Sequence, residues 1–469
     1  MPATNRPPSP PGHWLLGNLP EFRRDMLGFF TRCAREYGDF VALKLGPRRV
    51  HLASHPDFVE QVLVTENRKF GKSYVFELLR PVLGNGLLNS EGEFWLRQRR
   101  LIQPAFSKSS VNNYAGSIIE YTQRLLAEWS GGQRCDLHGE MTRLTMGIVG
   151  KALMDIDLTE VSSEVAAPLE EAMRDFSHRF ESAWNFPPWV PTPRNRRAKR
   201  NVQRLDAVVN RIIRARREAG GDRGDLLSKL IHVRDEVDHT GMTDRQLRDE
   251  VMTLFLAGHE TTANALAWTF FLLGQNAAAE NRLHEELIAV VGDRWPDAAD
   301  VPKLVYTEAV LKESMRLYPP AFAFSRRVLA DAAIGGYHVP AGSAVIMSQW
   351  VIHRDERWWD EPEQFLPERW LEATPKPRPA YAYFPFGGGP RGCIGNTFAM
   401  LEAILVVAAI AARYRIELIA PETVRPWPSV TLRPRGAIQA VLHSRTPMRS
   451  LSDGSAVDAA LSGRPSAGL

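Results

Sequence analysis

One glycine-rich stretch holds the most unusual arrangement of reactive residues in the chain. The sequence FPFGGGPRGCIGN, residues 384–396, places Cys393 just before a long apolar segment that is typical of a buried helix. Glycines on both sides allow the backbone to fold closely around the sulfur, and the N–H groups at the start of a helix favour a thiolate. The other two cysteines, Cys33 and Cys135, are far apart and typical of buried, unreactive residues. Cys393 is therefore the first candidate for chemistry.

Two interpretations of Cys393 follow from this loop. A thiolate is a soft metal ligand, but a single cysteine cannot form a zinc or iron–sulfur site alone. One cysteine is sufficient where a porphyrin supplies the four other iron ligands, and Arg391 would then pair with a porphyrin propionate. The alternative is an inert cysteine in a turn, and the loop alone does not decide between the two.

The same stretch also fits a nucleotide-binding pattern. Residues 387–392, GGGPRG, match G-x-G-x-x-G, and a predicted helix follows them. However, Pro390 lies where a backbone N–H should face a pyrophosphate, and Pro385 interrupts the strand that should precede the loop. This interpretation also leaves Cys393 without a role, so a nucleotide-dependent dehydrogenase is the third and least favoured alternative, which the colour of the purified protein would distinguish.

A second candidate site is AGHETT, residues 257–262, inside a long helical run. Helical spacing puts Ala257, Glu260 and Thr261 on one face. Glycine and threonine cost a helix about 0.5–1 kcal/mol each relative to alanine. Threonine hydroxyls can bond back to helix carbonyls and make room for a water. Taken alone, the motif fits either an acid placed for proton transfer or a surface glutamate beside two packed threonines.

Two further pairs of residues and one single arginine are candidates for a site. Glu313 and Arg316 of ESMR are i, i+3 neighbours on a helix, a spacing that is typical of surface pairs. Trp95 and Arg99 of WLRQR share a helix face at i, i+4, and Arg326 follows a double-proline turn.

Together these motifs resemble the cytochrome P450 family. The segment 386–395 is similar at every position to the haem-binding loop of that family, and AGHETT is similar to the oxygen-binding part of its long central helix. ESMR and the later PERW, residues 367–370, are similar to its buried ionic network. The resemblance runs from about Pro8 to Ser444.

The resemblance implies a role for each matching residue. Cys393 becomes the axial ligand of the haem iron, and Phe386 lies beside its sulfur. Glu260 relays protons, and Thr261 stabilises the bound oxygen. The haem propionates are expected to bind the cationic and aromatic set Trp95, Arg99, Arg326 and Arg391. A buried structural network is expected from Glu313, Arg316 and Arg369.

The elements that must position these residues are mainly helical. The 469 residues are 44% hydrophobic and 24% charged, and 58 Lys+Arg against 54 Asp+Glu is too balanced for a dedicated nucleic-acid binder. Strands are predicted near 40–53 and after Pro319. We expect a mainly α protein with a smaller β-rich part, the cytochrome P450 fold as a single large domain over 1–445, and a disordered tail over 446–469. The predicted helices are 56–66, 93–103, 111–130, 141–154, 164–184, 198–219 and 243–274.

The resemblance implies a monooxygenase with haem b (iron protoporphyrin IX) as cofactor and O₂ as co-substrate. Electrons are expected from a ferredoxin or flavodoxin with its NAD(P)H-dependent reductase, steered by arginines that include Arg97 and Arg100. The sequence predicts no transmembrane anchor and a cytoplasmic location. The class that competes with an enzyme is a haem-based sensor, and the Glu260–Thr261 pair argues against it because a sensor needs no proton relay.

The substrate is expected to be a hydrophobic small molecule, such as a terpenoid, a fatty acid or a steroid-like compound, because the residues that the resemblance assigns to the pocket are mostly apolar. The helix end near Phe180 and Trp184 is expected to contribute residues to the pocket. The segment 186–200 is interpreted as a solvated loop and helix start, or as a lid over the pocket that contacts substrate or membrane. The pocket itself is predicted from Phe76, Leu87, Thr253, Ala257, Ala321, Phe322 and Val430.

Overall fold

The computed structural model describes residues 5–157, 189–371 and 377–445, together with Pro168, Glu171, Asp175, His178 and Arg179. The expected tail 446–469, Phe180, Trp184 and most of the helix expected over 164–184 lie outside these residues. The single domain over 1–445 therefore stays a prediction.

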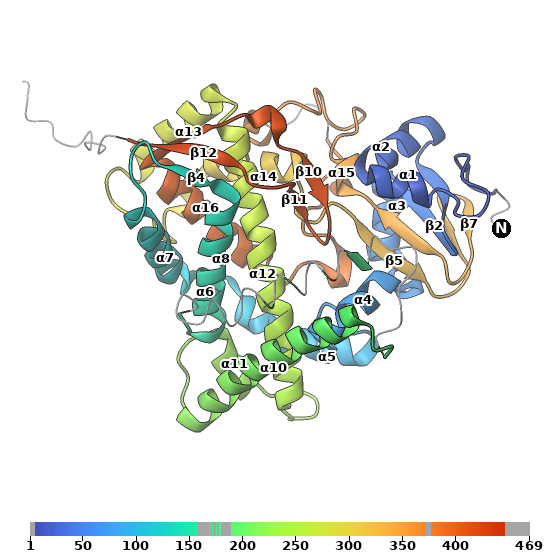
Figure 1. Ribbon diagram of the computed structural model, residues 1–469, viewed down its shortest axis with the longest axis horizontal. Helices are drawn as coiled ribbons and strands as arrows, with labels where there is room; N and C mark the ends of the chain where they lie inside the picture. The colour runs from blue at the N-terminus through green and yellow to red at the C-terminus, as the bar shows by residue number, and fades with distance from the viewer. Residues whose placement is uncertain are drawn as a thin grey trace, which may run out of the picture.

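The long helix α12 (Asp244–Leu273) runs through the middle of the molecule (Figure 1). A capping box starts it, because the Thr243 hydroxyl accepts from Gln246 N and the Gln246 side chain accepts from Thr243 N. Helix α8 (Leu137–Met154) packs along α12, and α16 (Asn396–Ala411) is buried on all sides because its sequence is apolar all round.

The remaining helices form most of the molecule, which confirms the prediction of a mainly α protein. The segments expected over 93–103, 198–219 and 243–274 are helical with ends shifted by a few residues. These other helices are α1 (Leu19–Arg24), α2 (Met26–Tyr37), α3 (Pro56–Glu60), α4 (Tyr74–Leu83), α5 (Gly92–Ile102), α6 (Lys108–Asn112), α7 (Ala115–Ala127), α10 (Pro193–Ala219), α11 (Leu226–His232), α13 (Ala277–Val290), α14 (Val305–Leu317) and α15 (Gln349–Ile352).

The β-rich part is separate from the helices around α12 and is seen beside α1, α2 and α3 in Figure 1. Its main sheet has the order β1-β2-β8-β5-β3, with β2 and β8 parallel and the other neighbours antiparallel. These strands are β1 (Phe40–Leu45), β2 (Arg48–Ala53), β3 (Phe70–Lys72), β5 (Phe324–Val328) and β8 (Ala344–Met347).

Three small sheets complete the fold. Strands β4, β12 and β9 form one, β6 and β7 form a hairpin, and β10 and β11 form another whose turn lies against α12. Their bounds are β4 (Arg134–Asp136), β6 (Ala332–Ile334), β7 (Tyr337–Val339), β9 (Tyr414–Leu418), β10 (Pro426–Pro428), β11 (Leu432–Pro434) and β12 (Gln439–Ser444).

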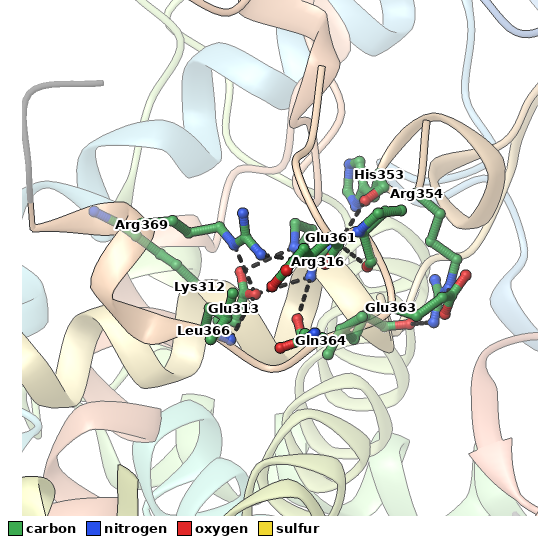
Figure 2. A network of polar contacts seen from close by, with 12 residues as sticks. Lys312, Glu313, Arg316, His353, Arg354, Glu361, Glu363, Gln364, Leu366 and Arg369 are labelled. Carbon is green, nitrogen blue, oxygen red and sulfur yellow. Dashed lines mark hydrogen bonds and ion pairs between the residues drawn. The ribbon is translucent and has the colours of Figure 1, made fainter. Parts of the chain in front are cut away.

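A buried ionic network fastens α14 to the chain that follows it (Figure 2). Glu313 and Arg316 are both 0% exposed, and Arg369 donates Nε–H to Glu313 Oε1 at 2.9 Å. Arg316 donates to Glu313 through Nε and Nη2 and to the carbonyls of His353, Pro362 and Gln364. Each of its five guanidinium N–H groups therefore has an acceptor. The structure thus brings together the three residues that the sequence assigned to a structural network.

Candidate active site

A cavity of about 450 Å³ lies between α12, the cysteine loop 386–395, the segment 320–326 and the β10–β11 turn. Its walls are mainly apolar, and polar side chains occur at only a few places. Cys393, Glu260 and Thr261 all border this one cavity, although they come from distant parts of the chain. The apolar walls include Val75, Phe76, Leu79, Ala257, Ala321, Phe322 and Val430.

The backbone of the loop holds Cys393 at the cavity wall, three residues before α16 begins. Cys393 N donates to Phe386 O at 2.9 Å, and Arg99 Nη1 donates to Gly392 O at 2.9 Å. The thiol is exposed to this internal cavity rather than to outer solvent. Burial raises the pKa of the Cys393 thiol, and the Gly395 N–H and the Arg99 charge oppose that shift without reversing it.

The sequence predicted that backbone N–H groups of the loop favour the thiolate, and the Gly395 N–H does lower the pKa of Cys393. Burial acts in the opposite direction and has the larger effect. A metal cation supplies the charge that makes a buried thiolate favourable, so the thiol fits a metal ligand. In contrast, Cys33 and Cys135 are buried thiols whose pKa burial raises to about 12.

Gly389 locks the cysteine loop onto the β-rich part of the molecule. Its φ is +64°, and a Cβ atom there would lie 1.9 Å from Leu63 O. Leu63 belongs to a π-helical turn, Gln61–Thr65, that follows α3. Only glycine permits both this backbone conformation and this approach. The position of the loop is therefore set by residues more than 300 positions earlier in the chain.

The acid–threonine pair lies on the cavity face of α12. Thr261 Oγ1 donates to Ala257 O at 2.6 Å, and Thr262 Oγ1 donates to Gly258 O at 3.0 Å. Thr145, from α8, donates to His259 O at 2.9 Å. Three consecutive carbonyls of α12 thus accept threonine hydroxyls, while α12 remains α-helical through the motif.

Two arginines line the cavity beside the cysteine loop, of which Arg326 is buried and Arg391 is half-buried. Arg326 is 7% exposed, and burial together with the charge of Arg391 lowers its pKa to about 10. Arg391 donates to Ser90 O at 3.1 Å, and its guanidinium lies 4.3 Å from the centre of the Trp95 ring. Trp95 and Arg99 do not line the cavity. Trp95 contacts Arg391 and Arg99 bonds to the loop, and their expected role as propionate ligands stays a prediction.

Lys72 is a third cation beside these arginines, although it does not line the cavity, and the sequence analysis missed it. It lies directly opposite Arg326 in the antiparallel β3–β5 pair. Burial lowers its pKa well below the usual lysine value, and the charges of Arg326 and Arg391 lower it further. Like charges opposite each other across two strands are destabilising unless an anion lies between or beside them. The negative charge of Glu91 acts on all three cations and partly offsets these effects, although no carboxylate of the described residues forms an ion pair within 4.0 Å with any of them.

The structure brings Phe76, Ala257, Ala321, Phe322 and Val430 to the cavity wall, as the sequence predicted. Two predicted pocket residues are not there.

Leu87 is buried in the helical core, and its N–H donates to Glu250 Oε2 at 2.9 Å. Thr253 turns toward Gly86, where a Cβ atom would lie 2.2 Å from Thr253 Oγ1. Both predictions are corrected, because contacts between α12 and the segment 84–90 occupy these side chains.

Comparison with known proteins identifies the family over nearly the whole chain. The cytochrome P450 family profile matches residues 7–440. The chain belongs to the cytochrome P450 family. Cyclooctatin synthase of Streptomyces melanosporofaciens is 38% identical over 426 residues, covering 90% of this P450 and 93% of that protein.

Two other relatives have names that state what they act on. Cyclooctat-9-en-7-ol 5-monooxygenase from the same organism is 37% identical, with 89% of each chain covered. Pentalenene oxygenase of Streptomyces avermitilis is 31% identical, covering 92% of this P450 and 96% of that protein. This chain is accordingly a haem-thiolate monooxygenase that uses O₂, electrons from a redox partner and a hydrophobic substrate.

The residues present fit a haem. Across the described ranges, no group of three or more His, Cys, Asp or Glu side chains could hold a metal ion. A metal at Cys393 therefore needs its other ligands from a cofactor such as a porphyrin. Lys72, Arg326 and Arg391 supply the positive charge that two propionates require.

Two arginines expected to attract a redox partner are committed to internal contacts. Arg97 bonds to Asp238, Thr240 and Gly241, and Arg100 pairs with Asp235 at 3.0 Å. Among the described residues, no helix has the length and apolar character needed to cross a lipid bilayer.

Proposed function

We propose that this P450 hydroxylates or epoxidises a terpenoid in the cavity beside Cys393. The observation that carries the proposal is that a candidate iron ligand and an acid–threonine pair border one apolar cavity of about 450 Å³. Mainly apolar walls suit a hydrocarbon skeleton with few polar groups. Two of the relatives above are named for terpenoids, cyclooctat-9-en-7-ol and pentalenene, which supports this substrate class over fatty acids and steroids.

Each polar residue of the cavity has a distinct task in this proposal. Cys393 would hold the iron of haem b, and Lys72, Arg326 and Arg391 would pair with its propionates. Haem with a thiolate ligand supplies, when bound, the activation of O₂ by cleavage of the O–O bond. The apolar wall residues orient the substrate and exclude water, which keeps reducing equivalents from being lost to side reactions.

Glu260 and Thr261 manage protons at the cavity wall. The Glu260 carboxylate can accept a proton from solvent and pass it to a water in the cavity. Thr261 Oγ1 already donates its hydrogen to Ala257 O, so its lone pairs are left to accept a hydrogen bond from a water or a ligand. The pair therefore holds a proton donor and an acceptor side by side on adjacent residues.

We further propose that the electron donor is a small acidic ferredoxin or flavodoxin with its NAD(P)H-dependent reductase. The protein carries a net charge of +4, which favours association with an acidic partner.

The deciding experiment is a titration of purified holoenzyme with terpenes, fatty acids and steroids, followed in the Soret band. We expect a shift toward high spin with a terpenoid, and ¹⁸O₂ should then label one oxygen of the product. A shift with fatty acids or steroids alone would overturn the terpenoid class. Folded, haem-supplied protein without a Soret band would overturn the role of Cys393.

A further inference from the structure

One face of α12 is bonded to the β10–β11 turn at three successive helical turns. Thr431 Oγ1 donates to Glu260 Oε1 at 2.7 Å, and Asn264 Nδ2 donates to Thr431 Oγ1 at 3.0 Å. Trp268 Nε1 donates to Leu432 O at 2.9 Å. Glu260, Asn264 and Trp268 are spaced at i, i+4 and i+8, so they lie one above another on the helix. The catalytic acid is thus the last member of a ladder that fixes this turn.

The hydrogen bonds of this ladder all point toward Glu260. An ionised carboxylate only accepts, so the single hydroxyl hydrogen of Thr431 is used on Glu260. Thr431 must then accept from the Asn264 amide, which leaves Asn264 Oδ1 facing His138 Nε2 at 2.9 Å. His138 therefore donates its Nε2–H, and burial lowers the pKa of His138, which favours this neutral ring. In the series of hydrogen bonds His138–Asn264–Thr431–Glu260, each residue donates to the next one.

Such a chain orients the carboxylate and does not conduct protons. Asn264 accepts at its oxygen and donates at its nitrogen, and an amide cannot pass a proton between these atoms in its ordinary form. Asn264 is 0% exposed and Thr431 is 6% exposed, so the chain is shielded from competing water. Bonds in a directional, water-excluded chain reinforce one another.

Among the described residues, no cation forms an ion pair with Glu260. No lysine, arginine or histidine nitrogen of the described residues lies within 4.0 Å of its carboxylate. A positive partner would hold the carboxylate in place but also oppose its protonation. A neutral hydroxyl donor fixes the geometry while leaving the carboxylate able to take up a proton.

We infer that Thr431, supported by Asn264 and His138, is a positioning residue that directs the Glu260 carboxylate toward the cavity during proton delivery. The inference rests on the proposed function, because it assigns Glu260 its role there. It adds a residue from the far end of the chain to the proton-handling machinery.

The test compares Thr431→Val, which removes only the hydroxyl, with Thr431→Ser, which restores it. Thr269→Val is the matched control, because Thr269 is a fully buried threonine of α12 that donates to Ala265 O and has no bond to the β10–β11 turn. Thermal unfolding of each holoenzyme shows whether it folds. If Thr431→Val does not fold, Thr431→Ser still keeps the test informative.

Two measurements separate positioning from a general structural role. Product formed per NAD(P)H consumed should fall about tenfold in Thr431→Val, as expected for losing one hydrogen bond to a charged group. The ligand concentration that half-saturates the Soret shift should stay within about twofold, and Thr431→Ser should recover the yield. Equal losses in Thr431→Val and Thr269→Val would overturn the inference.

A spectroscopic measurement does not depend on turnover. The infrared carboxylate band that disappears in Glu260→Gln reports Glu260 directly, and it should shift in Thr431→Val and return in Thr431→Ser. An unchanged band would overturn the inference even if the enzyme oxidises terpenoids. A shifted band in an enzyme that oxidises no terpenoid would overturn the proposed substrate and leave the positioning intact.

Discussion

Arg316 and Arg326 are two buried arginines with opposite surroundings. Arg316 is 0% exposed, and all five of its N–H groups reach a carboxylate or carbonyl of the chain itself (Figure 2). Arg326 is 7% exposed, yet in the described part of the chain it donates one hydrogen bond, to Ser325 O. Lys72 lies directly opposite it. The hydrogen-bond donors of Arg316 are all satisfied within the protein, whereas those of Arg326 leave room for an anionic ligand.

The difference shows how to separate structural from ligand-binding charge. A buried cation that is fully hydrogen-bonded within the chain belongs to the folding energetics, and its removal leaves a buried carboxylate behind. Three cations grouped around a single carboxylate, as Lys72, Arg326 and Arg391 are around Glu91, keep an excess of positive charge that destabilises the protein until a ligand neutralises it. Each of the following predictions tests this distinction, in order of decreasing expected effect.

Removing Arg316 should have the largest effect. We expect Arg316→Met to lower the free energy of unfolding by about 3–5 kcal/mol, because the buried Glu313 would keep only Arg369 as a cationic partner and three carbonyls would lose their donor. Urea unfolding of the purified protein measures this loss. The control is Lys312→Met on the same helix, which breaks an exposed 2.7 Å pair with Glu308 and should cost under about 1 kcal/mol. Similar losses in both variants would contradict the comparison.

A second prediction extends the comparison to buried carboxylates, through the pH dependence of the free energy of unfolding. Burial raises the pKa of Glu250 to about 7 from 4.5, against the opposing hydrogen bonds from Leu87 N and Gln98. The folded state therefore binds this proton more tightly than the unfolded state does. Its contribution to stability is lost as pH rises from 4.5 to about 7, by about 3 kcal/mol.

Glu313 should act in the opposite direction. Burial opposes its ionisation, but Arg316 and Arg369 outweigh burial and lower its pKa. Its contribution is present above the unfolded pKa and is lost as pH falls through the lower folded value. Unfolding measured from pH 4.5 to 8 should show the Glu250 slope vanish in Glu250→Gln. A slope that persists in that variant would assign the effect to another group.

The third prediction concerns the ligand-binding cations, whose removal should not lower the stability of the haem-free protein. Arg326→Met should leave the haem-free protein as stable as wild type or more stable, because it removes a poorly compensated buried charge. The holoenzyme should lose haem about tenfold faster, since a charge-assisted bond is gone. Haem transfer to an excess of acceptor protein measures this rate. The control is the exposed neighbour Arg327→Met, which lies 3.9 Å from Glu77 and should change neither quantity.

The smallest effect is expected at Lys72. It is only half-buried, and its charge is a single ammonium rather than a planar fork, so Lys72→Met should speed haem loss by about threefold. The same transfer assay measures it, and the double variant with Arg326→Met shows whether the two cations act on one ligand. Strictly additive effects would indicate that they do not share it.

The sequence predicted well those features that depend on short spacings. Glu313 and Arg316, like Glu260 and Thr261, sit within one helical turn, so helical periodicity places each pair before any tertiary contact forms. Lys72 and Thr431 were missed because their partners lie more than 160 positions away, across strand pairing and a turn that no local pattern encodes. The sequence FGKSYVF did carry a signal, a lysine in a short strand beside a predicted pocket segment.

The errors at Leu87 and Thr253 share one cause. Family resemblance located the right segments, but tertiary packing decided which side chain of each segment faces the cavity. At Cys393 the sequence predicted the effect of the loop N–H groups, while the larger effect of burial could not be predicted from it. Burial depends on everything packed around the loop, and that information is not local.

The contact between Gly389 and Leu63 O has a consequence for building chimaeras of this enzyme with its relatives. The backbone of the cysteine loop approaches the π-helical turn Gln61–Thr65 so closely that no side chain fits at Gly389. The two segments therefore have to match each other. Recombined genes should keep both segments from the same parent. A crossover that separates them pairs one parent's loop with the other's turn, and the iron-ligand position then depends on two backbones that were never matched.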